Sequence, residues 1–152
     1  MDFILDVFRN ECLLSVGIAW ILAQIIKVFT GYFREEPFSF RKFFSGTGGM
    51  PSSHSATVVA LLTSSVTVYG VGGYEAAASL LFAIIVMSDA MGVRLETGKQ
   101  AKVINMMAKE LFLGKAKNPQ ENLKELIGHT PLQVFVGALL GLLVAVVVCT
   151  LF

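Results

Sequence analysis

The chain has 152 residues; 55% are hydrophobic, only 15% are charged, and 12 basic residues nearly balance 11 acidic ones. The net charge of +1 leaves no broad basic face for binding nucleic acid. So large an apolar fraction excludes a disordered chain and argues against a soluble domain. We therefore expect a single integral membrane domain over residues 1–152, without a cleaved signal peptide because the start lacks a basic segment.

Long uncharged stretches predict the membrane-spanning helices. A helix needs about 20 mostly apolar residues to cross a bilayer. Asp, Glu, Lys and Arg are all absent from residues 12–26, 43–74, 76–88 and 126–152. The sequence thus predicts an all-α membrane protein with about four spanning helices, at residues 12–33, 54–71, 74–92 and 131–152.

Three shorter helices are predicted outside these spans. Residues 1–11 have the pattern of a short amphipathic helix that precedes the first span. Residues 98–113 carry an apolar stripe beside several lysines, which predicts an amphipathic helix on the membrane surface or covering the bundle. A capping pattern at residues 118–121 predicts a further short helix that ends at Gly128.

Counting the crossings places most polar residues at one membrane face. The first span ends over Lys27 to Arg34, the second begins at His54, the third arrives at Asp89 and the fourth leaves from His129. Eleven of the 12 basic residues belong to this face, and the positive-inside rule makes it cytoplasmic. We expect a multi-pass protein of the plasma membrane with a site on its cytoplasmic side.

The strongest local pattern is the glycine-rich segment GTGGMPSSHSA at residues 46–56. Glycine lets a backbone approach a ligand closely, and the first turn of the following helix offers free N–H groups and a positive dipole end. Gly49, Ser52 and Ser53 are therefore candidate phosphate ligands. The alternative is a plain loop with a serine helix cap.

His54 and His129 each open a predicted span at the same face, which points to acid–base and nucleophilic chemistry. A neutral imidazole can attack phosphorus, and a charged one can protonate a leaving oxygen. Asp89 near membrane depth needs a partner, either Arg94, Lys27 or a histidine. The alternative is two interfacial histidines and a structural ion pair.

Further basic residues are candidates for holding a phosphate. Lys27 and Arg34 lie two helical turns apart and so share a face, where they either clamp phosphate oxygens or extend to lipid headgroups. Arg94 and Lys99 add two more candidates. Gly137 and Gly141 form a GxxxG pattern that serves either packing inside the chain or a homodimer.

The order of these motifs resembles the type 2 phosphatidic acid phosphatase superfamily, which includes vanadium-dependent haloperoxidases. The similarity is greatest to its small divergent branch. It rests on GGMPSSHSA at residues 48–56, DAMGVR at 89–94, GKQA at 98–101 and GHTPL at 128–132. The resemblance covers roughly residues 12–145.

This resemblance implies metal-independent hydrolysis of a lipid phosphomonoester, with no cofactor. His129 would be the nucleophile that forms a phosphohistidine, and His54 the general acid. Phosphate oxygens would be held by Lys27, Arg34, Ser52, Ser53 and backbone amides of residues 48–53. The partners expected are thus a lipid phosphate and the bilayer.

The chain departs from the main family at several positions. Gln133 stands four residues after His129, where the family has Asp, and the usual Ser-Arg pair before that histidine is Asn122-Leu123. Asp89 and Arg94 are expected to replace the lost groups. Two alternatives stay open: a non-catalytic protein that binds or translocates phosphorylated headgroups, and a metal-assisted phosphatase using Asp89, His54 and His129.

Overall fold

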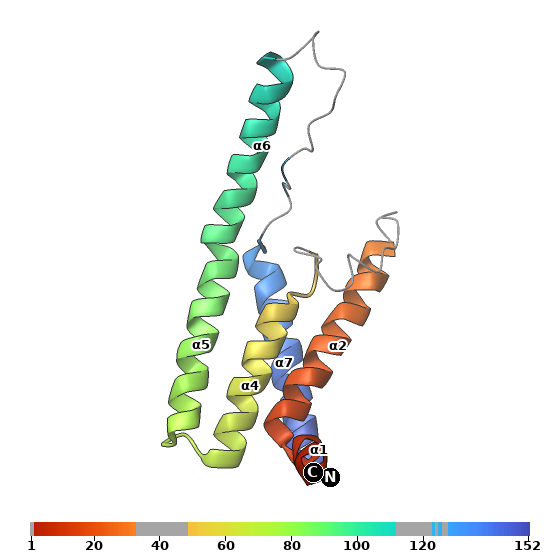
Figure 1. The fold of residues 1–152 in the computed structure, drawn as a ribbon, viewed down its shortest axis with the longest axis vertical. Helices are drawn as coiled ribbons and strands as arrows, with labels where there is room; N and C mark the ends of the chain where they lie inside the picture. Colours follow the sequence, from red (N-terminus) through yellow and green to blue (C-terminus); the bar gives the residue numbers. More distant parts are fainter. Residues whose placement is uncertain (1, 33–48, 112–122, 124, 126–127) are drawn as a thin grey trace.

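The computed structural model describes residues 2–32, 49–111, 123, 125 and 128–152, and every regular element among them is a helix. The elements are α1 (Asp2–Arg9), α2 (Glu11–Tyr32), α4 (Ser53–Tyr69), α5 (Tyr74–Met91), α6 (Val93–Leu111) and α7 (Pro131–Leu151). These bounds lie within one or two residues of the predicted spans and of the short entry helix. Figure 1 shows α2, α4, α5 and α7 side by side, with the chain reversing direction between α4 and α5.

Small side chains let the central helices pack closely. The core cluster contains only alanine and valine: Ala19, Ala23, Ala56, Ala60, Val144, Ala145 and Val148, from α2, α4 and α7. Such residues allow backbones to approach, which is the usual way that membrane helices gain packing energy. α4 is the central element, because it contacts α2, α5 and α7.

The GxxxG pattern packs α7 against α4 within the chain. Gly137 and Gly141 are buried. A methyl group on Gly137 would overlap the Ser52 carbonyl, and one on Gly141 would overlap the Ala56 carbonyl. Of the two roles that the sequence left open, the structure shows internal packing. The homodimer stays a prediction, and these two glycines are already occupied by α4.

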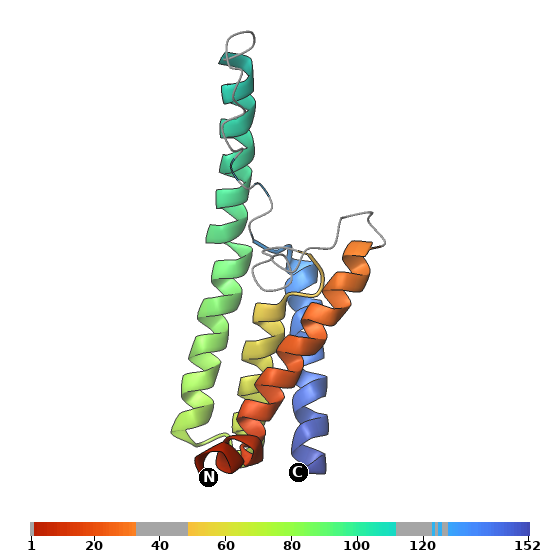
Figure 2. The same cartoon turned by 45° about the vertical axis from the view of Figure 1, so that its right-hand side comes forward.

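The helix predicted at residues 98–113 has a different start and direction from those expected. It begins at Val93 and continues α5, so that α6 extends past the other helices (Figures 1 and 2). It therefore does not cover the bundle. The physical reason lies at Gly92, which interrupts the helix without ending its hydrogen bonding: Gly92 N–H donates to Ser88 O at 2.8 Å, and Glu96 N–H to Gly92 O at 3.0 Å.

The surface of the bundle carries larger apolar side chains than its core. Large exposed hydrophobic residues on three helices include Ile21, Ile25, Phe29, Leu81, Ile84, Ile85, Leu139, Leu143 and Val147. Three described helical stretches are long and apolar enough to cross a membrane: Glu11–Thr30, Tyr74–Glu110 and Pro131–Leu151. These stretches agree in length and composition with three of the four predicted spans.

The fourth predicted span, α4, is shorter and more polar than the other three. It has 17 residues, the lower end of the range for a crossing helix. Several of its hydroxyl groups bond carbonyls of the same helix: the Ser64 hydroxyl donates to Ala60 O at 2.8 Å and the Thr57 hydroxyl to Ser53 O at 2.7 Å. Such bonds lower the cost of polar side chains in an apolar surrounding.

The short helix predicted after residue 118 lies mostly outside the described residues. Leu123 and Glu125, which are described, are not helical. Asn105 of α6 holds Leu123 by two hydrogen bonds, donating to its carbonyl at 2.9 Å and accepting from its N–H at 3.0 Å. The side-chain amide thus pairs with this backbone as a neighbouring strand would.

Candidate functional site

The two histidines meet at one end of the bundle, from different helices. His54 lies in the first turn of α4, and His129 lies just before α7. Their ring centroids are 6.3 Å apart with an angle of 58° between the planes. His129 is buried, with 3% of its surface exposed, whereas His54 is exposed. One imidazole is therefore held inside the site while the other faces its opening.

The backbone around Gly128 fixes the position of His129. Gly128 has φ +95°, and a Cβ there would lie 2.7 Å from the Arg94 carbonyl carbon. Only glycine tolerates both this conformation and this approach. The His129 N–H donates to Ala90 O at 3.0 Å. The junction of α5 and α6 is thus joined to the start of α7.

Gln133 contacts His129 from one turn further along the chain. Its Oε1 lies 3.2 Å from His129 Nδ1 and accepts the Thr130 N–H at 3.1 Å. The Thr130 hydroxyl accepts the Gln133 N–H, which completes a capping box at the start of α7. The Gln133 carbonyl also accepts the Ser52 N–H at 3.1 Å. Gln133 therefore links the segments that carry the two histidines.

Lys27 lies against the glycine-rich segment. Its Nζ donates to the Ser53 hydroxyl at 3.3 Å. Gly49 has φ +83°, and a Cβ there would lie 3.2 Å from Lys27 Cγ, so glycine leaves room for the lysine stem. The Thr30 hydroxyl donates to Met50 O at 2.8 Å, which joins the end of α2 to this segment.

Ser52 is buried and caps α4. Its hydroxyl oxygen accepts the Ser55 N–H at 3.3 Å and the Ser55 hydroxyl at 2.9 Å. Among the described residues, the backbone N–H groups of Ser53 and His54 have no acceptor. A helix N-terminus with free N–H groups attracts an anion. The candidate anion-binding groups of this segment are therefore its backbone N–H groups, with Ser52 holding the helix start.

Asp89 and Arg94 form an ion pair with each other, between Arg94 Nε and Asp89 Oδ2. Their side chains are 36% and 45% exposed, so the pair lies at the edge of the site. The charges of both residues act on the His54 ring. The sequence expected Asp89 to stand in for the missing carboxylate next to His129, but it is Gln133 that contacts that ring.

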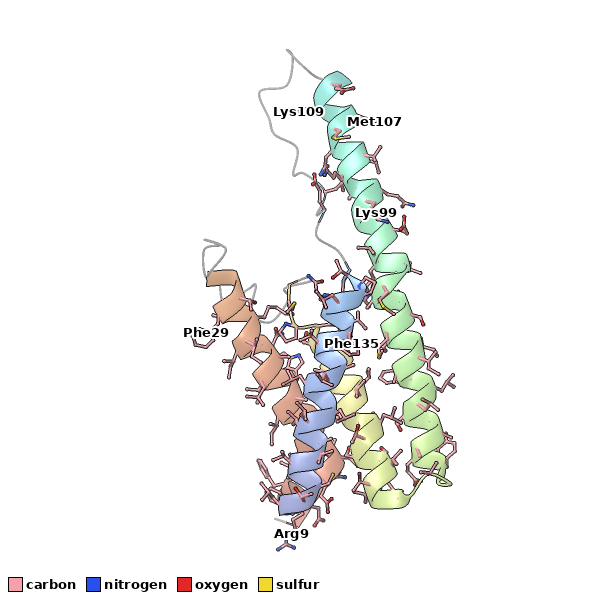
Figure 3. All side chains as sticks on the ribbon, turned by 180° about the vertical axis from the view of Figure 1, so that it is seen from behind. Arg9, Phe29, Lys99, Met107, Lys109 and Phe135 are labelled. Atoms are coloured by element: carbon pink, nitrogen blue, oxygen red, sulfur yellow. The ribbon has the colours of Figure 1, made fainter. Side chains whose placement is uncertain are left out.

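Lys99 is not brought to the histidines. Its Nζ bonds Glu96 Oε1 at 2.7 Å, and both side chains are exposed. Figure 3 shows Lys99 on the part of α6 that continues past the start of α7. Arg34 lies outside the described residues. Among the described side chains, no group of three or more His, Cys, Asp or Glu is placed to hold a metal ion, so Asp89, His54 and His129 do not form one.

The environment of His129 favours its neutral form. Burial lowers the pKa of His129 from its ordinary value near 6.5; the hydrogen bond with Gln133 raises it, and the charges of Lys27, His54 and Arg94 lower it. Loss of water penalises the charged ring, and three nearby cationic groups repel it. A neutral imidazole is the form that can donate electrons to phosphorus.

Sequence reasoning missed three parts of this site. The sequence predicts only a helix end at Gly128, whereas the structure shows a close approach to Arg94 and Leu95 there that positions His129. The sequence predicts Gln133 as part of a helix-capping signature, which the structure confirms, and as a lost carboxylate, but it does not predict the contact with the His129 ring. No local pattern indicated that the carbonyl of Ala90 would hold the His129 backbone.

These features define a helical membrane protein with a polar, two-histidine site at one end of its bundle. A model of the Divergent PAP2 family matches residues 8–144, and the chain belongs to that family. It is 39% identical over 158 aligned residues to the uncharacterized membrane protein YuiD of Bacillus subtilis (strain 168), covering 97% of this chain and 99% of that protein. No solved structure matches the chain significantly. The family predicted from the motifs is confirmed.

Proposed function

We propose that the protein is a metal-independent phosphatase that hydrolyses a lipid phosphomonoester through a phosphohistidine. The observation that carries the proposal is the 6.3 Å separation of the His54 and His129 rings beside Lys27 and the free N–H groups of α4. PAP2-related families often contain phosphatases. The phosphatase assignment therefore agrees with both the family and the geometry.

The ring separation suits a single phosphoryl group between the imidazoles. Before reaction, a nucleophile lies about 3–3.5 Å from the atom that it attacks. A general acid lies about 2.6–3.2 Å from the oxygen that it protonates. With 6.3 Å between the ring centroids, both imidazoles lie within reach of one phosphoryl group. The buried ring, His129, is the nucleophile, and the exposed ring, His54, meets the leaving alcohol at the opening.

The reaction proceeds in two balanced steps. His129 Nε2 attacks phosphorus, the P–O bond to the lipid alcohol breaks, and the His54 imidazolium gives its proton to the leaving oxygen. Water then attacks phosphorus and gives a proton to His54, the P–N bond breaks, and inorganic phosphate leaves. Lys27, Arg94 and the backbone N–H groups of Ser53 and His54 stabilise the charge that develops on the phosphoryl oxygens. Arg34 is proposed to join them.

A lipid substrate follows from the surroundings of the site. Phe29 on α2 and Phe135 on α7 are 62% and 65% exposed, and Figure 3 shows both near the site end of their helices. Each lies within two turns of a site residue, Lys27 or His129. Acyl chains can therefore contact apolar side chains while the phosphate reaches the imidazoles.

The proposed topology has α4 as a fourth crossing and the site on the cytoplasmic side of the plasma membrane. The count of basic residues supports this side. A cysteine in place of Lys109, in a chain lacking Cys12 and Cys149, tests it. We expect it to resist a membrane-impermeant maleimide in intact cells and to react after lysis; labelling in intact cells would reverse the orientation.

A panel of lipid phosphates and pyrophosphates on the purified protein in detergent tests the activity. We expect His129→Ala and His54→Ala to lower phosphate release at least 100-fold while both fold normally, with Thr150→Ala at the far end as the matched control. Labelled phosphate should be trapped on the protein in an acid-labile, base-stable form that His129→Ala lacks. Full turnover by both histidine variants would refute the mechanism.

One observation favours a second function, the binding or translocation of phosphorylated headgroups without catalysis. Gln133 replaces the carboxylate that would support a cationic imidazole, and glutamine cannot neutralise that charge. In that case the wild type binds lipid phosphate, Lys27→Met weakens binding, and no phosphate is released or trapped. The same panel therefore separates the two functions.

A further inference from the structure

We propose that Gln133 is the positioning residue that keeps the His129 proton on Nδ1 and so leaves Nε2 free to attack. This inference rests on the proposed function, because it concerns how that nucleophile is prepared. The sequence gives no acidic residue at this position, and the main family's carboxylate is absent. The hydrogen bonds of the uncharged Gln133 side chain indicate how it orients the His129 ring in place of that carboxylate.

The direction of each hydrogen bond follows from the backbone. The Thr130 N–H can only donate, and it points at Gln133 Oε1 from 3.1 Å. The atom it meets must therefore be the acceptor oxygen of the amide. His129 Nδ1 lies 3.2 Å from the same oxygen, so it too must donate. An amide oxygen has two lone pairs, which accommodates both donors.

A neutral imidazole carries one proton. If that proton is on Nδ1, the lone pair is on Nε2, the nitrogen on the far side of the ring from Gln133. The capping box holds the Gln133 side chain, and the bond from His129 N–H to Ala90 O holds the histidine backbone. Both partners are thus fixed before substrate arrives, and the orientation is not lost to rotation of the amide.

Charged groups act on this ring from three elements, and among the described residues none of them hydrogen-bonds to its Nδ1. Lys27 of α2, Arg94 of α6 and His54 of α4 act on His129 through their charges. Asp89 of α5 is paired with Arg94. Among the described residues, Gln133 is therefore the group that accepts a hydrogen bond from the ring.

The first test is nitrogen NMR of the tautomer, since the chain holds only two histidines. In a His54→Gln variant without a polyhistidine tag, ¹⁵N-histidine labels His129 alone. At a pH above the pKa of His129, we expect Nδ1 to be protonated and Nε2 to be unprotonated. Gln133→Met, similar in size but lacking the acceptor, should shift the population toward Nε2–H. A protonated His129 Nε2 in the variant that retains Gln133 would overturn the inference.

The second test is kinetic and uses two substitutions with opposite effects. Gln133→Met should lower kcat about tenfold with little change in KM, and should move the acid limb of the pH–rate profile to lower pH. Gln133→Glu keeps both acceptor bonds, so it should retain turnover and move that limb about one pH unit higher, because the added carboxylate favours imidazolium. If the acid limb of the pH–rate profile is unshifted in both Gln133→Met and Gln133→Glu, the inference is wrong.

The two tests separate this inference from the proposed function. If the NMR shows Nδ1–H but no substrate is turned over, the tautomer assignment stands and the phosphatase proposal fails. If phosphate is released while the NMR shows Nε2–H, the phosphatase proposal stands and the role of Gln133 is wrong. Loss of folding in Gln133→Met leaves Gln133→Glu, which keeps the helix cap, to decide the kinetic test.

Discussion

The packing of α7 on α4 makes a sharp prediction at Gly141. In Gly141→Ala the new methyl carbon would lie 2.9 Å from the Ala56 carbonyl carbon and 3.0 Å from its Cα, and would overlap the carbonyl oxygen. Carbon atoms in contact are normally about 3.5–4.0 Å apart. The contacting atoms are backbone, so α4 and α7 must separate by roughly an ångström.

We expect Gly141→Ala to lower the free energy of unfolding by about 1–3 kcal/mol relative to a matched Gly17→Ala control. Gly17 lies inside α2 with no atom within 4 Å of its would-be Cβ. Both substitutions gain the same helix propensity, about 1 kcal/mol, which cancels in the comparison. Thermal unfolding in detergent should therefore give melting temperatures that differ by about 2–12 °C.

Equal melting temperatures for the two variants would refute this packing argument. A change in the oligomer's size in detergent with an unchanged melting temperature would instead indicate that Gly141 serves a dimer. Because α4 carries His54 and α7 follows His129, the same shift should lower phosphatase activity about 100-fold if the proposed function holds.

Three further predictions test other parts of the structure. Because burial lowers the pKa of folded His129, the unfolded chain binds more protons than the folded chain at mildly acidic pH. In a His54→Gln background the free energy of unfolding should therefore fall as the pH drops through about 6.5, and level off below the folded-state pKa. Adding His129→Gln should remove this pH dependence. If the free energy of unfolding depends on pH equally with and without His129→Gln, this prediction is wrong. Lys27→Met should lower kcat/KM about 10- to 100-fold by removing a charged donor, whereas Lys109→Met, on the extension of α6, should not. Asn105→Ala should raise hydrogen exchange at the Leu123 amide about 2- to 10-fold without affecting α7, because it removes that amide's acceptor; unchanged exchange would show that the bond is not kept in solution.

The sequence by itself determined the long apolar helices and the family. Uncharged length and capping residues located α2, α4, α5 and α7 within one or two residues, because the bilayer and the helix termini impose local requirements. Motifs in order identified the family, since their long strings are specific. Crossing parity also predicted that His54 and His129 lie at one end, because antiparallel helices bring alternate ends together.

Only the tertiary structure decided which polar groups meet. It showed Gln133 on the His129 ring, Asp89 on Arg94, and Lys99 on Glu96 instead of in the site. It also showed that α6 continues α5 past Gly92, the residue at which the sequence predicted the third span to end. These outcomes depend on helix rotation and on distances of a few ångströms between separate segments, and residue spacing along one chain does not specify either quantity.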